Sequence, residues 1–218
     1  MQALYDSPWH SPALFWMLGV MLLALVARQV GFLLGFTILF AVEIMADALV
    51  TGAWSPVPAS SRWAQPLAIA FVILGDYRYF LLVERYVRGG LGRAALAALG
   101  WSFAIPLASQ AMMRAAPTLF VDGRAIFLGY ELAFTLLALV LRFVVLPRRL
   151  GRVSPAIRRW LLAVTSFELA QYALWAIADI VILSGIEAGF LLRLVPNTMY
   201  YGLFLPFVLL SAPTEARA

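Results

Sequence analysis

Long apolar runs recur along the whole of this 218-residue chain, and they restrict its fold more than any other feature. Hydrophobic residues make up 64% of the sequence, charged residues make up 12%, and the mean hydropathy is +0.92. A stretch of about 20 apolar residues is the length that an α-helix needs to cross a bilayer. The pattern predicts an all-α membrane protein, a single seven-transmembrane-helix bundle with the lipid bilayer as partner. The predicted spans are residues 12–28, 30–52, 66–87, 94–114, 125–147, 158–184 and 188–211.

The placement of arginine predicts the orientation of this bundle, because short loops that carry positive charge stay on the cytoplasmic side. Most arginines lie around the loops after the third and fifth spans: Arg85, Arg88, Arg93, Arg142, Arg148, Arg149, Arg152, Arg158 and Arg159. We therefore expect an outside N-terminus and a cytoplasmic C-terminus in a bacterial inner membrane. The same arginines account for the pI near 10, so no nucleic-acid binding is predicted. Glu84, Arg85 and Tyr86 end the third span and are typical of interfacial anchoring.

Ionisable side chains interrupt the apolar runs, and Asp76 lies nearest the middle of its span. A charge at bilayer mid-depth costs at least about 2.5–3.5 kcal/mol, so it is normally tolerated only in a protein-lined interior. Arg78 and Arg193 could each neutralise one acid and serve helix packing alone. The acids outnumber these two arginines, so the surplus must be protonated, hydrated or bound to a cation. We predict a polar cavity for protons and a small-molecule ligand or lipid, with candidate residues Glu43, Asp47, Asp76, Glu131, Glu168, Trp175, Asp179, Arg193, Asn197 and Tyr200.

The second and third spans resemble the sixth and seventh at a few positions. MetAlaAsp at 45–47 matches IleAlaAsp at 177–179, and GlyAspTyrArgTyrPhe at 75–80 can be laid over ProAsnThrMetTyrTyr at 196–201. With the fourth span left over, the pattern suggests a three-plus-one-plus-three arrangement of parallel repeats. Repeats in transporters place the substrate site near mid-depth, where the two halves meet.

This arrangement assigns roles to the candidate residues. Asp76 and Glu43 are expected to carry protons, and Asp179 with Glu168 are expected to be their counterparts in the second repeat. Three polar or aromatic residues at helical spacing are expected to contact the substrate: Trp175, Asn197 and Tyr200.

The seven-span plan with its outside N-terminus and internal repeat resembles the superfamily that groups PQ-loop and sugar-exporting transporters with microbial rhodopsins. The Pro-Gln signature of the PQ-loop families is absent, and Pro196-Asn197 stands near the corresponding bend. Microbial rhodopsins bind retinal through a lysine of the last helix, and this chain has no lysine, so covalent retinal is excluded. No cysteine and a single histidine, His10, also exclude Cys- and His-rich metal sites, and we predict no cofactor.

The sequence therefore predicts a small proton-coupled or facilitative transporter of a polar or cationic solute. One alternative is an intramembrane enzyme that acts on lipid or isoprenoid substrates through paired carboxylates, drawn from Glu43, Asp47, Asp76 and Asp179. GlyAsp at 75–76 resembles the membrane lysoplasmalogenases, which implies hydrolysis of lipid vinyl ethers. A third interpretation is a seven-helix sensor or an accessory subunit of a membrane complex, which a closed interior of paired residues would favour.

Overall fold

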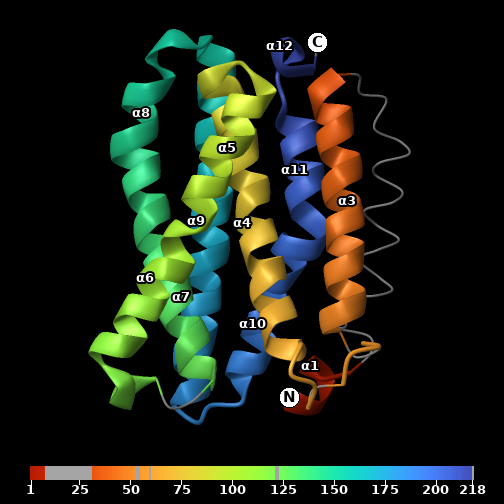
Figure 1. Ribbon diagram of the computed structural model, residues 1–218, viewed down its shortest axis with the longest axis vertical. Helices are drawn as coiled ribbons and strands as arrows, with labels where there is room; N and C mark the ends of the chain where they lie inside the picture. The colour runs from red at the N-terminus through yellow and green to blue at the C-terminus, as the bar shows by residue number, and fades with distance from the viewer. Residues whose placement is uncertain (8–30, 53–54, 59, 121–122, 218) are drawn as a thin grey trace. The chain divides into compact units, whose positions relative to one another are not determined.

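The computed structural model describes residues 1–7, 31–52, 55–58, 60–120 and 123–217, and all regular secondary structure in these ranges is helical (Figure 1). The elements are α1 (Gln2–Tyr5), α3 (Gly31–Thr51), α4 (Ala64–Arg88), α5 (Leu91–Ser102), α6 (Ala104–Ala115), η1 (Pro117–Leu119), α7 (Gly123–Val140), η2 (Leu141–Val145), α8 (Leu146–Arg149), η3 (Leu150–Arg152), α9 (Pro155–Leu183), α10 (Ala188–Thr198), η4 (Met199–Leu203), α11 (Phe204–Ser211) and α12 (Thr214–Arg217).

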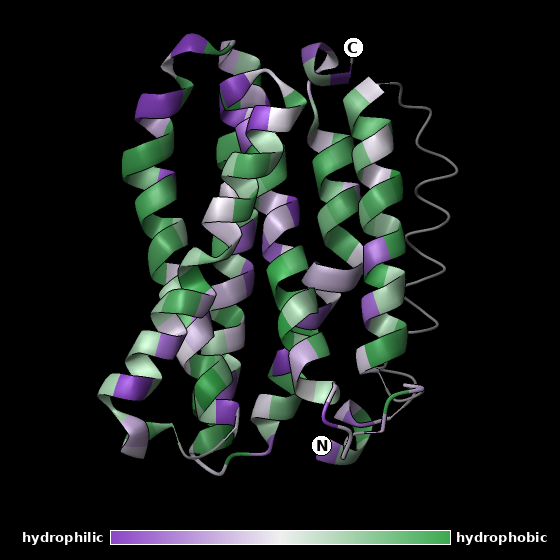
Figure 2. Cartoon of the chain, viewed as in Figure 1, coloured by the Kyte–Doolittle hydropathy of each residue, from purple (hydrophilic) through white to green (hydrophobic). Residues whose placement is uncertain are grey.

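Six helical stretches in the described ranges are long and apolar enough to cross a membrane: Gly31–Thr51, Pro66–Arg88, Leu91–Ala115, Gly123–Arg152, Pro155–Leu183 and Ala188–Ser211. They coincide with six of the seven predicted spans, and the predicted span 12–28 lies outside the described residues. Apolar residues cover the helix bodies, and hydrophilic residues gather toward the helix ends and connections (Figure 2). Large apolar side chains are also widely exposed, as in Leu210 at 77% and Leu96 at 73%. Such a surface fits an integral membrane protein surrounded by lipid.

The chain divides into two compact units, and the division falls within α4 and α10. Unit 1 comprises Met1–Gly75 and Asn197–Ala218, and unit 2 comprises Asp76–Pro196. In unit 1, α3 packs against α11 and α12. Its core includes Phe36 and Phe40 of α3, whose ring centroids are 4.8 Å apart, and Phe204 of α11.

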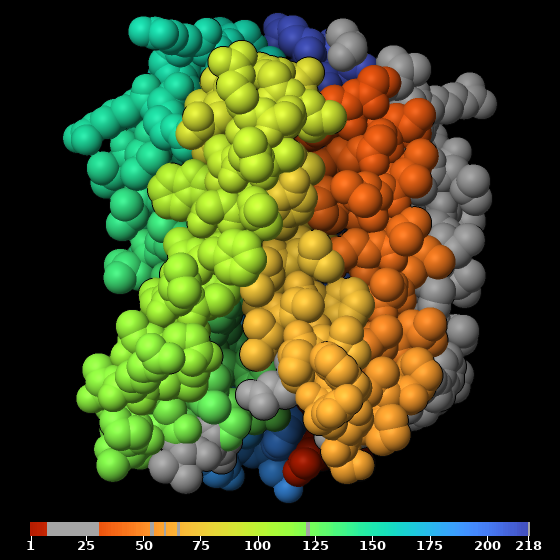
Figure 3. Space-filling model, viewed as in Figure 1, coloured from red at the N-terminus to blue at the C-terminus, as the bar shows by residue number. Residues whose placement is uncertain are grey.

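Unit 2 is built on the pairing of α7 with α9, which lie side by side in Figure 1. The ring of Phe134 on α7 stacks on that of Tyr172 on α9, with centroids 3.8 Å apart and 18° between the planes. Helices α5 and α6 form an outer surface of this unit (Figure 3). Exposed apolar residues of α6 include Leu107, which is 67% exposed.

The predicted span 94–114 is a helix with a break rather than a straight rod, because α5 and α6 meet at Phe103. Pro106 has no N–H group to donate to the carbonyl of Ser102, four residues earlier. In addition, the Ser102 hydroxyl donates a hydrogen bond to the carbonyl of Ala98 at 2.8 Å, and a serine bond of this kind often bends a helix. The break therefore follows from the proline and the serine together.

The ends of α9 carry the chemistry that starts and stops a helix. Ser154 accepts a hydrogen bond from the N–H of Ile157 at 3.3 Å, and Pro155 occupies the first helical position. At the other end, Gly185 has a φ of +79°, and the N–H of Ile186 donates to the carbonyl of Val181 at 3.2 Å. This Schellman ending closes the helix between the predicted spans 158–184 and 188–211.

A close helix contact within unit 1 generates a stability prediction. A Cβ added at Gly75 would lie 2.9 Å from two ring carbons of Tyr200, closer than side chains tolerate. We expect Gly75→Ala to lower the free energy of unfolding by about 1–3 kcal/mol, because the ring must move. Gly35→Ala is the matched control, since its added Cβ meets none of the described residues within 4 Å. Thermal unfolding in detergent tests this, and equal stability of the two variants would contradict the predicted contact.

Candidate functional site

Asp76 lies in unit 2 on α4 and is 1% exposed, so its carboxylate oxygens need partners inside the protein. The hydroxyl of Tyr172 on α9 donates to Oδ1 at 2.5 Å, and the hydroxyl of Tyr130 on α7 donates to Oδ2. Short O–H···O bonds of this kind are typical of an ionised acceptor. Three helices therefore converge on one carboxylate, and each of its oxygens has a donor.

Two further charged side chains lie within electrostatic range of Asp76. The fully buried guanidinium of Arg78 interacts with the charge of Asp76 and with that of Glu168 on α9. The two carboxylates also interact with each other. Oε1 of Glu168 is buried and has no hydrogen-bond partner among the described residues. We call Asp76, Arg78 and Glu168 the middle cluster, in which two carboxylates interact electrostatically with one guanidinium.

Aromatic rings support the tyrosines of this cluster. The ring of Tyr172 stacks on Phe134 and packs edge-on against Trp175, with the latter centroids 5.2 Å apart. The Tyr79 hydroxyl lies 3.0 Å from Oγ1 of Thr165. Because Thr165 donates its own proton to a backbone carbonyl of α9, Tyr79 is the donor in this pair. The rings are thereby held in fixed orientations around Asp76.

A second group of charges joins α7, α9 and α10, and we call it the Asp179 cluster. Asp179 is fully buried, and its Oδ1 accepts hydrogen bonds from Arg124 at 2.9 Å and from Arg193. Arg193 also donates to Oε1 of Glu131 at 3.2 Å. Two guanidinium groups face two carboxylates, so this cluster is balanced in charge. The Arg193 contacts match the helix-packing alternative that the sequence left open.

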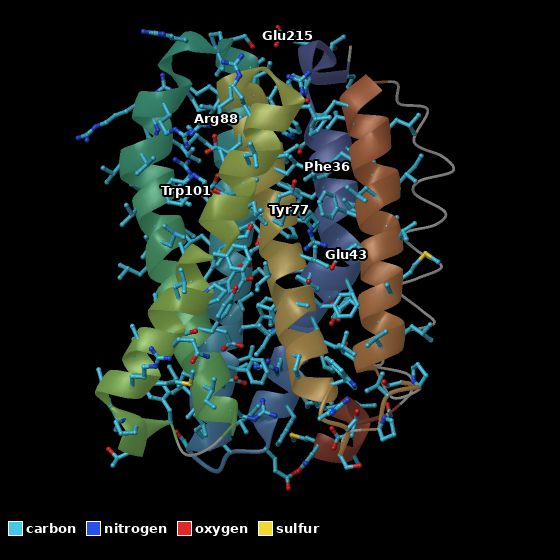
Figure 4. All side chains as sticks on the ribbon, viewed as in Figure 1. Phe36, Glu43, Tyr77, Arg88, Trp101 and Glu215 are labelled. Carbon is cyan, nitrogen blue, oxygen red and sulfur yellow. The ribbon has the colours of Figure 1, made fainter. Side chains whose placement is uncertain are left out.

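Glu84 lies near the end of α4, is 1% exposed and binds four donors. Arg149 of α8 donates to both oxygens, at 2.6 and 2.8 Å, and Arg88 donates to Oε2 at 2.6 Å. The indole N–H of Trp101 on α5 donates to Oε1 at 3.0 Å. Arg88 and Trp101 are labelled in Figure 4. The sequence-based interpretation as interfacial anchoring therefore missed a buried carboxylate that joins three helices.

Unit 1 has polar side chains of its own along α3. Asp47 is buried, accepts a hydrogen bond from Oγ1 of Thr51 at 2.8 Å and bonds with the hydroxyl of Tyr201. Glu43, also buried, lies within electrostatic range of the same hydroxyl, as expected for residues one helical turn apart. A pocket of about 380 Å³ lies beside this group and is lined by Val50, Thr51, Gly52, Ser55, Val57, Pro58, Ala64, Leu67 and Ala68.

The predicted site residues thus separate into several groups. In unit 2, Asp76 and Glu168 belong to the middle cluster, and Trp175 adjoins it through Tyr172. The Asp179 cluster holds three more predicted residues: Glu131, Asp179 and Arg193. The other four lie in unit 1: Glu43, Asp47, Asn197 and Tyr200. The carboxylates considered for an enzyme are likewise divided, with two in each unit.

Sequence reasoning did not select three polar side chains of these helices: Tyr130, which binds Asp76, Tyr201, which binds Asp47, and Gln171, which is fully buried on α9. Each directly adjoins a residue that the sequence points to: Glu131 is the acid of its span, and Tyr172 and Tyr200 stand at helical spacing from other polar residues. Tyr201 lies about 100° around its helix from Tyr200, so a stripe chosen at spacings of three and four passes over it. The remaining signal was their polarity inside an apolar span.

Comparison with known proteins leaves the function to be inferred from the site itself. No protein-family model, curated protein or solved structure matches the chain. In the part of the chain that the structure describes, no group of three His, Cys, Asp or Glu side chains could hold a metal ion. Carboxylates, guanidinium groups and tyrosine hydroxyls are the chemistry that the site offers.

Two adjacent arginines of α8 provide a matched test of the Glu84 contacts. Arg149→Gln removes a two-point bond to a buried carboxylate, so we expect the free energy of unfolding to fall by about 1–3 kcal/mol. Arg148 is exposed and forms no such bond with the part of the chain that the structure describes, so Arg148→Gln should change stability little. Denaturant unfolding in detergent measures both. Equal losses for the two variants would show that the Glu84 contacts contribute nothing specific.

Proposed function

We propose that the chain is a small proton-coupled transporter of a polar or cationic solute, and that Asp76 and Glu168 form its proton-carrying site. The topology of this proposal follows the arginine placement: seven spans, an outside N-terminus and a cytoplasmic C-terminus in a bacterial inner membrane. The internal repeat and a substrate site at mid-depth are part of the same proposal.

The observation that carries the proposal is the charge of the middle cluster. Two buried carboxylates lie within electrostatic range of one buried guanidinium, whereas Glu84 has two arginines and the Asp179 cluster is balanced. An excess negative charge in a lipid-surrounded interior is costly unless a proton or another cation neutralises it. The middle cluster therefore needs one positive charge that it does not hold, and that requirement supports reversible binding of a proton or a cation.

Hydrogen bonding favours Glu168 as the residue that holds the proton. Both oxygens of Asp76 accept tyrosine O–H bonds, which stabilise its ionised form. Oε1 of Glu168 has no such donor in the described ranges. We therefore assign the fixed negative charge to Asp76 and the exchangeable proton to Glu168. The ionisable groups that act on Glu168 are Asp76, Arg78, Tyr79, Tyr130 and Tyr172.

Proton coupling follows from competition at Glu168. When its proton leaves, the carboxylate regains the excess charge and attracts a cationic solute to the same place. When the solute leaves, a proton restores neutrality. A single carboxylate that alternates between these partners makes solute movement depend on the proton gradient.

A membrane enzyme acting on a lipid or isoprenoid substrate is the second candidate. One ionised and one protonated carboxylate close together also suit general acid–base chemistry. The same middle cluster supports this candidate, so activity assays on reconstituted protein separate the two. Conversion of a lipid substrate without solute uptake would favour the enzyme.

The test is uptake into proteoliposomes under an imposed pH gradient, with radiolabelled methylammonium and an enclosed pH-sensitive dye. We expect the wild type to couple uptake to proton movement and Glu168→Gln to reduce coupled uptake to background, because the exchangeable proton site is gone. Glu187→Gln, the same change at an exposed position between α9 and α10, should retain coupling. Wild-type uptake that ignores the gradient, or full coupling in Glu168→Gln, would refute the assignment.

A further inference from the structure

Gln171 on α9 is a fully buried amide for which the described structure provides no partner. Its exposed fraction is zero, and neither Oε1 nor Nε2 has a hydrogen-bond partner among the described residues. Nearly all buried polar side chains in proteins are hydrogen-bonded to protein, water or ligand. Oε1 of Gln171 therefore calls for a hydrogen-bond donor that the described residues do not supply.

Glu168 precedes Gln171 by three residues on α9. Side chains at this spacing lie on one side of a helix, with their Cβ atoms about 5–6 Å apart. Oε1 of Glu168 is likewise buried without a hydrogen-bond partner in the described ranges. Trp175 lies four residues after Gln171, on the same side of α9. A carboxylate, an amide and an indole thus follow one another along one helix side.

The side chains of Glu168, Gln171 and Trp175 determine which kind of ligand can bind there. The oxygens of Glu168 and Gln171 are two acceptors, so a ligand that satisfies both must bring two N–H or O–H donors. The negative charge of Glu168 favours a cation, and the face of a tryptophan attracts one. Calcium would need six to eight oxygen ligands, far more than these two side chains offer. A protonated amine fits the charge, the donors and the aromatic neighbour.

We infer that Glu168 and Gln171 form a binding subsite for a protonated amine that carries at least two N–H groups. This inference rests on the proposed function for the route by which the amine arrives, and it names the solute class. The ammonium group replaces the proton of Glu168, which leaves to water, and it donates one hydrogen bond to each side chain. Gln171 distinguishes amines by their N–H groups, because a fully methylated nitrogen cannot donate to it.

The experiment is calorimetric titration of the full chain in lipid nanodiscs with methyl-, dimethyl-, trimethyl- and tetramethylammonium chloride at constant ionic strength. Charge stays the same along this series while the N–H count falls from three to zero. We expect the first two to bind, trimethylammonium to bind about tenfold or more weakly, and tetramethylammonium to show no binding. Equal affinities across the series, or no binding by any member, would overturn the inference.

Variants locate the site on the chain. Gln171→Leu should weaken methylammonium binding about tenfold or more, and Glu168→Gln should abolish it. Gln110→Leu, the same change at an exposed position of α6, should bind as the wild type does. Wild-type affinity in Gln171→Leu would overturn the inference. If Gln171→Leu does not fold, Gln171→Asn replaces it, and the methylation series on the wild type decides independently.

The amine subsite and the transport function can be refuted independently of each other. N–H-dependent binding without gradient-driven uptake would leave the amine subsite in place and refute the transporter. Proton-coupled uptake of another solute, with no amine binding to the purified protein, would refute the subsite and leave the transporter. A water-filled site predicts no calorimetric response to any amine, which is one of the overturning results.

Discussion

A carboxylate inside a lipid-surrounded bundle must be neutralised by groups that the chain itself supplies. Lipid tails are as apolar as leucine, so helices in a bilayer are held together by packing and polar contacts rather than by the hydrophobic effect. In unit 2 the buried acids therefore join helices far apart in sequence: Glu84 reaches Arg149, Asp179 reaches Arg124, and Asp76 reaches Tyr172. Much of what positions α4, α7, α9 and α10 within that unit follows from this requirement.

The three clusters differ in how completely their carboxylates are neutralised. Glu84 binds four donors, as many as two carboxylate oxygens readily accept, and the Asp179 cluster has equal numbers of arginines and acids. The middle cluster has two acids for one arginine, and Oε1 of Glu168 and the amide of Gln171 find no hydrogen bond in the described ranges. Clusters whose acids are matched in number by arginines are suited to holding helices in place. The cluster with one acid in excess is suited to binding a proton or a cation that comes and goes, which is why the proposed function rests there.

Much of the fold could be predicted from the sequence, because membrane spans leave a direct signal in apolar length. The turns at Gly89 and Gly185 could be predicted as well, because glycine tolerates the positive φ that such turns need. Both glycines adopt a positive φ in the structure. The hydrogen-bond and ion-pair partners of the buried acids could not be predicted from the sequence. No sequence spacing relates Asp76 to Tyr130, 54 residues away, and only packing brings them together. Glu131 was selected because it is an acid inside its span, and the adjacent Tyr130 was not selected, although a helix inside a bundle touches neighbours on more than one side. Arg78 had no evident partner in the sequence, and its electrostatic contacts lie two residues away and on α9.

The central claim is that the middle cluster holds one exchangeable proton on Glu168. Infrared difference spectroscopy of the protein in lipid, recorded between acidic and alkaline buffer, tests it directly in the carbonyl-stretch region of protonated carboxylic acids. A protonated carboxyl band that disappears at alkaline pH is predicted for the wild type and for Glu84→Gln, and its loss is predicted for Glu168→Gln. A wild-type spectrum without such a band, or a band that persists in Glu168→Gln, would contradict the claim.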